Sequence, residues 1–102
     1  MVNLPENWTQ IEGTVRFVRA AEGKPDYSDV EVSVARAAPV EGFREALSNP
    51  VGSDIVVRVP NNVCQQLFIE PGAVIRTRVR RGRDPKLTFA HTREITVARA
   101  DG

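Results

Sequence analysis

The sequence of 102 residues contains one cysteine, one histidine and no long hydrophobic run. A single thiol, that of Cys64, can form neither an internal disulfide nor a site built from several cysteines, which is typical of a reducing compartment. The N-terminus lacks the basic start and the apolar stretch of a secretory signal, and no segment reaches the length of a membrane span. These absences predict a soluble, cytoplasmic protein.

Residues that usually carry catalysis or bind metals are scarce and isolated. His91 has no second histidine or cysteine near it in sequence, so we expect a polar surface or turn residue rather than a ligand or a general base. Cys64 has Phe68 at four-residue spacing, which favours packing, and no base can be identified for its thiolate. The carboxylates show no spacing of an acid–base pair. We therefore predict no catalytic residue, no metal site and no cofactor, and hence no enzyme.

What is present is the composition of one folded domain. Hydrophobic residues make up 41% and charged residues 26% of the chain, as in ordinary globular proteins. The length suffices for a single modest core. We expect a folded body at residues 10–98, an N-terminal arm at 1–9 and a short tail at 99–102, with Trp8 as a possible anchor of the arm.

The charge is distributed unevenly, although the net charge is only +1. Residues 1–75 contain six Lys or Arg and ten Asp or Glu, whereas residues 76–93 contain seven Lys or Arg and one acid. A basic segment of this density produces a strong local positive potential beside a mildly acidic body.

The basic segment also has the alternation of a β-strand. Side chains of a strand point alternately to opposite faces, so Ile75, Thr77 and Val79 are expected inward and the arginines between them outward. The outward face and the following turn carry six basic residues: Arg76, Arg78, Arg80, Arg81, Arg83 and Lys86. Such a row indicates either acids on a neighbouring strand, for example Glu12, or an anionic partner. Exposed ion pairs contribute only ~0–1 kcal/mol each, so the cluster favours a partner.

Four other segments have strand patterns and one has a helical pattern. The further strands are expected at residues 11–20, 29–36, 54–60 and 86–97, and the helix at 63–69. Gly13 inside the first strand indicates a bulge or a sharp bend. Asn61 or Asn62 can cap the helix.

The segment 29–36 alternates without interruption, which places Val30, Val32 and Val34 inward. Residues 37–53 are ambiguous. Within them, residues 41–48 could form one or two helical turns or belong to a long loop bounded by Pro39 and Pro50.

The order of three strands, a short helix and two strands resembles the OB-fold, a five-stranded Greek-key barrel. The resemblance covers residues 10–98 and rests on this order and on Gly13-Thr14-Val15, Val59-Pro60 before the helix, and Pro71-Gly72-Ala73-Val74-Ile75. The helix between the third and fourth strands argues against an SH3-like barrel. The resemblance implies an all-β fold that binds oligonucleotides, oligosaccharides or proteins on strands two and three, between loops 21–28 and 81–86.

The basic cluster indicates which kind of ligand this expected site would bind. Guanidinium groups match phosphate oxygens, and a basic turn beside a barrel groove suits single-stranded nucleic acid. We predict a module that binds single-stranded DNA or RNA with low sequence specificity through the six basic residues. Asp29 and Glu31 on the second strand would repel phosphates, so we expect the nucleic acid to avoid that strand and to pass Arg58 or Arg93.

Aromatic residues, only 6% of the chain, limit the contribution of base stacking. Tyr27 in the first loop and Trp8 in the arm are the preferred candidates for stacking, and Phe17 or Phe89 would be a candidate if it faced outward. Both phenylalanines are expected in the core, because Phe17 has the parity of Val15 and Phe89 lies on the face of the neighbouring leucine.

A protein-interaction module is the alternative, in which the same basic face meets an acidic partner or a second copy of the chain. The charge difference between residues 1–75 and 76–93 is compatible with such association. Attachment to an anionic membrane ranks last, since no basic amphipathic helix or lipidation signal is present.

Overall fold

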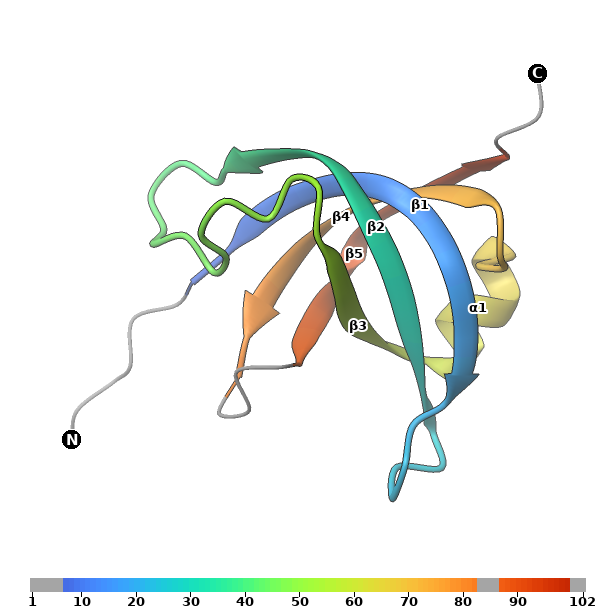
Figure 1. Cartoon of the computed structure of the whole chain (residues 1–102). Coiled ribbons are helices and arrows are strands. Elements are labelled where there is room, and N and C mark those ends of the chain that lie inside the picture. The colour runs from blue at the N-terminus through green and yellow to red at the C-terminus, as the bar shows by residue number, and fades with distance from the viewer. Residues whose placement is uncertain (1–6, 83–86, 100–102) are drawn as a thin grey trace, which may run out of the picture.

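The computed structural model describes residues 7–82 and 87–99 (Figure 1). The described residues form five strands and one helix. These elements are β1 (Thr9–Ala20), β2 (Tyr27–Pro39), β3 (Asp54–Pro60), α1 (Asn61–Leu67), β4 (Ala73–Arg81) and β5 (Thr88–Arg99). The predicted order of elements is thus confirmed, with β2 longer at both ends than its alternating core.

The strands close into a barrel in the order β1-β2-β3-β5-β4, and β4 pairs back onto β1. All pairings are antiparallel except the short parallel contact between β3 and β5, which joins Val57 to Thr88 and Arg58 to Phe89. The predicted all-β, five-stranded barrel with a short helix between the third and fourth strands is confirmed. Because β1 pairs with β2 and β4, it has to bend around the barrel.

Gly13 lies at the bend, as the sequence predicted. The β1–β2 register shifts between Glu12 and Gly13. A Cβ atom at Gly13 would overlap the carbonyl oxygen of Ser33 on β2 and press on Val32. The two backbones therefore approach each other at a distance that only glycine permits.

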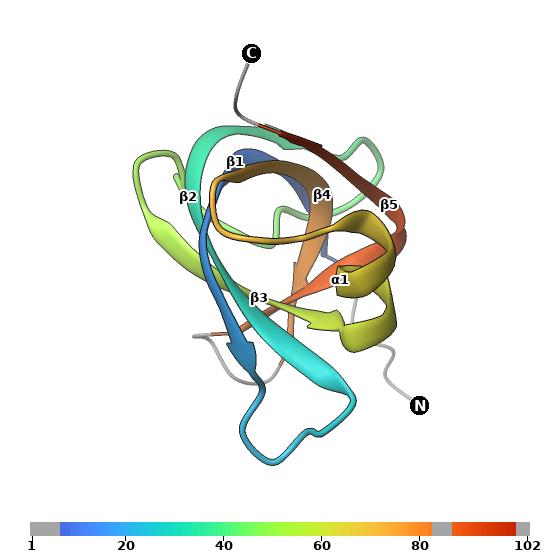
Figure 2. The ribbon, with the colours of Figure 1, turned by 90° about the vertical axis from the view of Figure 1, so that its right-hand side faces the viewer.

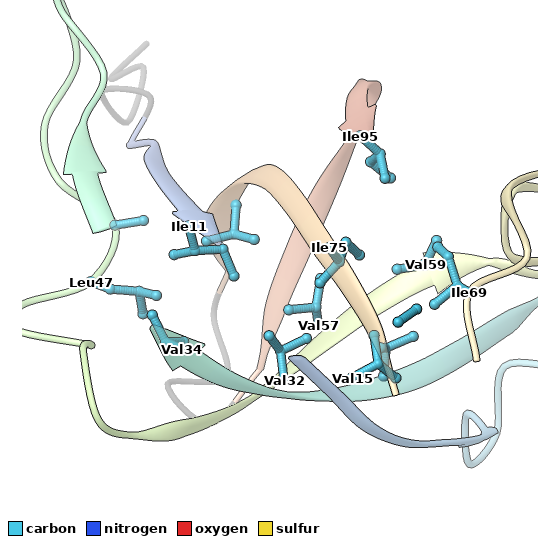
Figure 3. Packing of buried hydrophobic residues seen from close by; sticks show 14 residues of the cluster. Ile11, Val15, Val32, Val34, Leu47, Val57, Val59, Ile69, Ile75 and Ile95 are labelled. Atoms are coloured by element: carbon cyan, nitrogen blue, oxygen red, sulfur yellow. The ribbon is translucent and has the colours of Figure 1, made fainter. Parts of the chain in front are cut away.

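The core fills the barrel interior with aliphatic side chains from every strand (Figure 3). Val30, Val32 and Val34 of β2 are buried, as predicted, together with Ile75 and Val79 of β4. The alternation of each strand therefore assigns one face to this core and leaves the other for solvent or ligands.

Helix α1 covers one end of the barrel, beside β3 (Figure 2). The predicted cap was wrong: the N-cap residue is Pro60, and no side chain caps the helix. Asn61 instead ties the helix to the β1–β2 turn, since its side chain donates to the Pro25 carbonyl (2.8 Å) and accepts from the Ser28 hydroxyl (2.6 Å). The helix ends at Leu67, and its C-cap residue Phe68 has a left-handed backbone (φ 54°).

The connection between β2 and β3 contains no helix, which settles the open choice at residues 41–48 in favour of a loop. Its Ala46 and Leu47 are buried, and the hydroxyl oxygen of Thr9 accepts hydrogen bonds from both of their amides (2.8 and 3.2 Å). The loop thus closes the end of the barrel opposite α1, at the left of Figure 1.

Within the described part of the chain, no helix combines the length and the apolar character needed to cross a membrane.

Candidate functional site

The arginine row on β4 has the predicted orientation. Thr77 is 1% exposed and packs inward with its aliphatic neighbours. On the opposite face, Arg76 and Arg80 are exposed and Arg78 is half-buried. Arg81 at the end of the strand is also exposed. Strand alternation alone therefore places three guanidinium groups along one outer face of the barrel.

The acid expected to neutralise this row is engaged elsewhere. Glu12 of β1 lies opposite Arg76 in the register. Its carboxylate, however, lies 3.6 Å from Arg36 of β2. The Arg76 guanidinium is held instead by the Gln10 side-chain oxygen, which accepts from its Nε (2.6 Å) and Nη2 (2.8 Å) atoms once the carboxamide is oriented to do so.

Within the described residues, the other arginines of the row also have no acidic partner. Among residues 7–82 and 87–99, no carboxylate comes within 4.0 Å of the guanidinium groups of Arg76, Arg78, Arg80 or Arg81. A neutral amide orients Arg76 without cancelling its charge. The row therefore carries an unbalanced positive charge over the described surface.

A hollow of about 260 Å³ lies beside the row on the outer face of β4 and β5. Arg76, Arg78 and Arg93 line it, so the structure brings the predicted Arg93 next to the row. Glu94 and Gln10 also border the hollow. Three guanidinium groups around one hollow, against a single carboxylate, provide donors suited to an anionic oxygen group.

The acids of β2 are paired, which changes the expected electrostatics of that strand. The Asp29 carboxylate accepts from Arg58 Nε (2.9 Å) and Nη2 (3.3 Å), and both side chains are mostly buried. Glu31 lies 3.8 Å from Arg16. The strand is therefore less repulsive to phosphate than its sequence indicates. Arg58, predicted to lie along the path of the nucleic acid, already has the Asp29 carboxylate as its partner.

Phe17 does not lie in the core, so that prediction was wrong. The β1–β2 register shifts a second time between Val15 and Phe17, because Arg16 is inserted as an extra residue. This bulge moves Phe17 from the face of Val15 to the outer face, opposite Glu31, where it is 39% exposed. The alternation rule failed because a bulge cannot be read from residue parity.

Phe89 is likewise on the outer face. Thr88 is buried, so its neighbour Phe89 points outward and is half-buried. The ring packs against Gly82 and beneath the guanidinium of Arg80, whose carbon lies 5.5 Å from the ring centroid. Both phenylalanines were expected in the core, so the sequence placed them on the wrong face of their strands.

The two predicted stacking residues have different surroundings. Tyr27 is 39% exposed at the start of β2, two residues from Asp29 on the same outer face. Trp8 is half-buried against His91, with ring centroids 5.1 Å apart, and its amide donates to the Arg44 carbonyl (2.8 Å). Trp8 thus packs on the body of the protein and, being half-buried, is less exposed than Tyr27.

The residue before Trp8 also reaches the end of the arginine row. Asn7 donates to the Arg81 carbonyl (3.4 Å) and accepts from the Arg81 amide (2.8 Å). The other two predicted basic residues, Arg83 and Lys86, lie outside the described residues.

Other chemistry is limited in the part of the chain that the structure describes. No group of three or more His, Cys, Asp or Glu residues there is placed to hold a metal ion. His91 accepts a hydrogen bond from the Arg93 amide at Nδ1 (3.2 Å). Burial raises the pKa of the Cys64 thiol, and a hydrogen bond with Ser28 opposes this shift. The Cys64 thiol therefore lacks the lowered pKa of an activated nucleophile.

No family model, no curated protein and no solved structure matches the chain.

Proposed function

We propose that the chain is a non-catalytic OB-fold module that binds single-stranded DNA or RNA with low sequence specificity. The supporting observation is the arginine row of β4, whose guanidinium groups have no carboxylate within 4.0 Å among the described residues. Like charges held side by side repel one another, so the row contributes little to stability by itself. A polyanion with regularly spaced phosphates is the partner that satisfies several of them at once.

The barrel topology supports the same proposal. The strand order β1-β2-β3-β5-β4 and the helix between β3 and β4 are compatible with an OB-like fold. Exposed Phe17 and Tyr27 on the outer face of β1 and β2 add flat apolar surface near basic groups. A single strand has unpaired bases that can contact such surface, whereas a duplex does not.

Anisotropy titration of a fluorescent oligothymidine at low salt tests the proposal. Arg78→Glu and Arg80→Glu should each weaken binding by about tenfold or more, because each removes a charge-assisted hydrogen bond and adds repulsion. Arg44→Glu, the same charge change in the β2–β3 loop, serves as the matched control and should have a small effect.

Undetectable micromolar binding of oligothymidine at low salt would contradict the proposal, as would equal effects of the three substitutions. Self-association that depends on concentration and salt without nucleic acid, measured by sedimentation, would favour the protein-interaction alternative instead.

A further inference from the structure

The outer face of the barrel carries a row of residues that runs across the strands. The register places Arg19 of β1 opposite Asp29 of β2, Asp29 opposite Arg58 of β3, and Arg58 opposite Phe89 of β5. Phe89 is in turn opposite Arg80 of β4. The row therefore joins the C-terminal end of β1 to the arginine row of β4.

A groove follows this row over part of its length. A hollow of about 440 Å³ is lined by Arg19, Asp29, Val56, Arg58 and Leu87, among others. The lining combines the mutually neutralised pair of Asp29 and Arg58 with the apolar Val56 and Leu87, and it also includes Arg19 and Glu22. The paired and apolar part of this lining accepts the uncharged face of a base more readily than a phosphate, because both charges of the pair are already satisfied.

Each end of the row carries a phenyl ring with a guanidinium group over it. The carbon of the Arg19 guanidinium lies 5.1 Å from the centroid of Phe17, and that of Arg80 lies 5.5 Å from the centroid of Phe89. Both are cation–π arrangements at an exposed or half-exposed site. Each combines a flat π surface with a donor for phosphate, which are the two components of single-strand binding.

The local backbone holds both rings outward. The bulge at Arg16 turns Phe17 to the outer face, and the absence of a side chain at Gly82 makes room for the Phe89 ring. A Cβ atom at Gly82 would come within 2.8 Å of that ring. The bulge and the glycine therefore keep both rings at the outer face, where a ligand can reach them.

We infer that Phe17 and Phe89 are base-stacking platforms, and that one nucleic acid strand crosses the barrel from Phe17 to Phe89 before following the arginines of β4. The inference rests on the proposed function and adds the residues that contact bases. Three interstrand steps of about 4.8 Å separate β1 from β5, roughly 14 Å along the surface. The two rings thus contact bases a few nucleotides apart in the same strand. They also confer preference for unpaired bases over duplex.

Two ligands of equal charge separate stacking from phosphate binding: oligothymidine, and a strand of the same length that carries abasic deoxyribose phosphates. The wild-type protein should bind oligothymidine more tightly. Phe17→Leu and Phe89→Leu, which keep apolar volume but remove the ring, should each weaken oligothymidine binding by about five- to 150-fold and leave abasic binding unchanged. Phe43→Leu is the matched control, because Phe43 is 42% exposed in the β2–β3 loop.

A second readout observes one platform directly. In a Trp8→Phe background, Phe17→Trp should give tryptophan fluorescence that oligothymidine quenches and the abasic strand does not. Equal binding of both ligands, with both leucine variants unchanged, overturns the inference while leaving phosphate binding by the arginine row intact. Failure of both ligands to bind overturns the proposed function and the inference together.

Discussion

At the scale of single residues, Gly13 is the position where the barrel tolerates change least. Its Cα faces the Ser33 carbonyl across the β1–β2 pair, and an added methyl group would overlap that oxygen. Gly13→Ala should therefore lower the free energy of unfolding by about 1–3 kcal/mol, as expected for overpacking at a site that cannot relax. Thr14→Ala, a change at the exposed next residue, should stay within about 0.5 kcal/mol. Urea denaturation measures both, and equal stability of the two variants would show that β1 can shift to accommodate the methyl group.

Cys64 gives a second prediction at this scale, on pH dependence. Burial raises the pKa of its thiol, so less thiolate is present near neutral pH than in an exposed cysteine. Alkylation of the native protein by iodoacetamide should be slower than that of a cysteine peptide, with an inflection at higher pH. Because the pKa is raised in the folded state, folding favours the protonated thiol, and its contribution to the free energy of unfolding is fully present below the ordinary thiol pKa. This contribution is lost as the pH rises through the raised pKa of the folded state. Alkylation as fast as in the peptide at pH 7 would contradict the raised pKa.

At the scale of elements, the pair of Asp29 and Arg58 joins β2 to β3 and sets the charge of the groove. The two side chains are only 17% and 15% exposed and share two hydrogen bonds. Asp29→Asn should lower the free energy of unfolding by about 1–3 kcal/mol, because Arg58 loses a charged acceptor. The same change frees a guanidinium in the groove and should strengthen oligothymidine binding.

Glu31→Gln is the control for stability. Its carboxylate lies 3.8 Å from Arg16, which is 56% exposed, so its loss should change stability by less than about 1 kcal/mol. Thermal unfolding and the anisotropy titration provide the two readouts. Weaker oligothymidine binding by Asp29→Asn would mean that the carboxylate itself contacts the ligand.

The elements also differ in how far the sequence could predict them. Strands β2, β3 and β4 follow from uninterrupted alternation, because burial of one face forces a period of two. The bulge at Arg16 and the outward Phe17 could not be predicted, since an inserted residue is defined only by its partner strand. The Asp29–Arg58 pair was missed for the same reason: its members are 29 residues apart and meet only through the β2–β3 register.

At the scale of the whole molecule, the arginine row and the closed barrel, both predicted from the sequence, form one continuous outer surface. The closed order of strands brings β5 between β3 and β4, so the register runs from Asp29 and Arg58 through Phe89 to Arg80 of the arginine row. The sequence predicted the row and the barrel but assigned the nucleic acid a path that avoided β2. Pairing of the β2 acids with Arg58 and Arg16 lowers the expected repulsion between phosphates and that strand.

The salt dependence of oligothymidine binding tests the central claim most directly. If Arg76, Arg78, Arg80 and Arg81 each contact one phosphate, the logarithm of the association constant should fall with the logarithm of salt concentration with a slope of about −2.8, or −0.7 per contact. Arg78→Glu should make the slope shallower, whereas Phe17→Leu should lower affinity at every salt concentration without changing the slope. A wild-type slope near zero, or one that Arg78→Glu leaves unchanged, would contradict phosphate binding by the arginine row of β4.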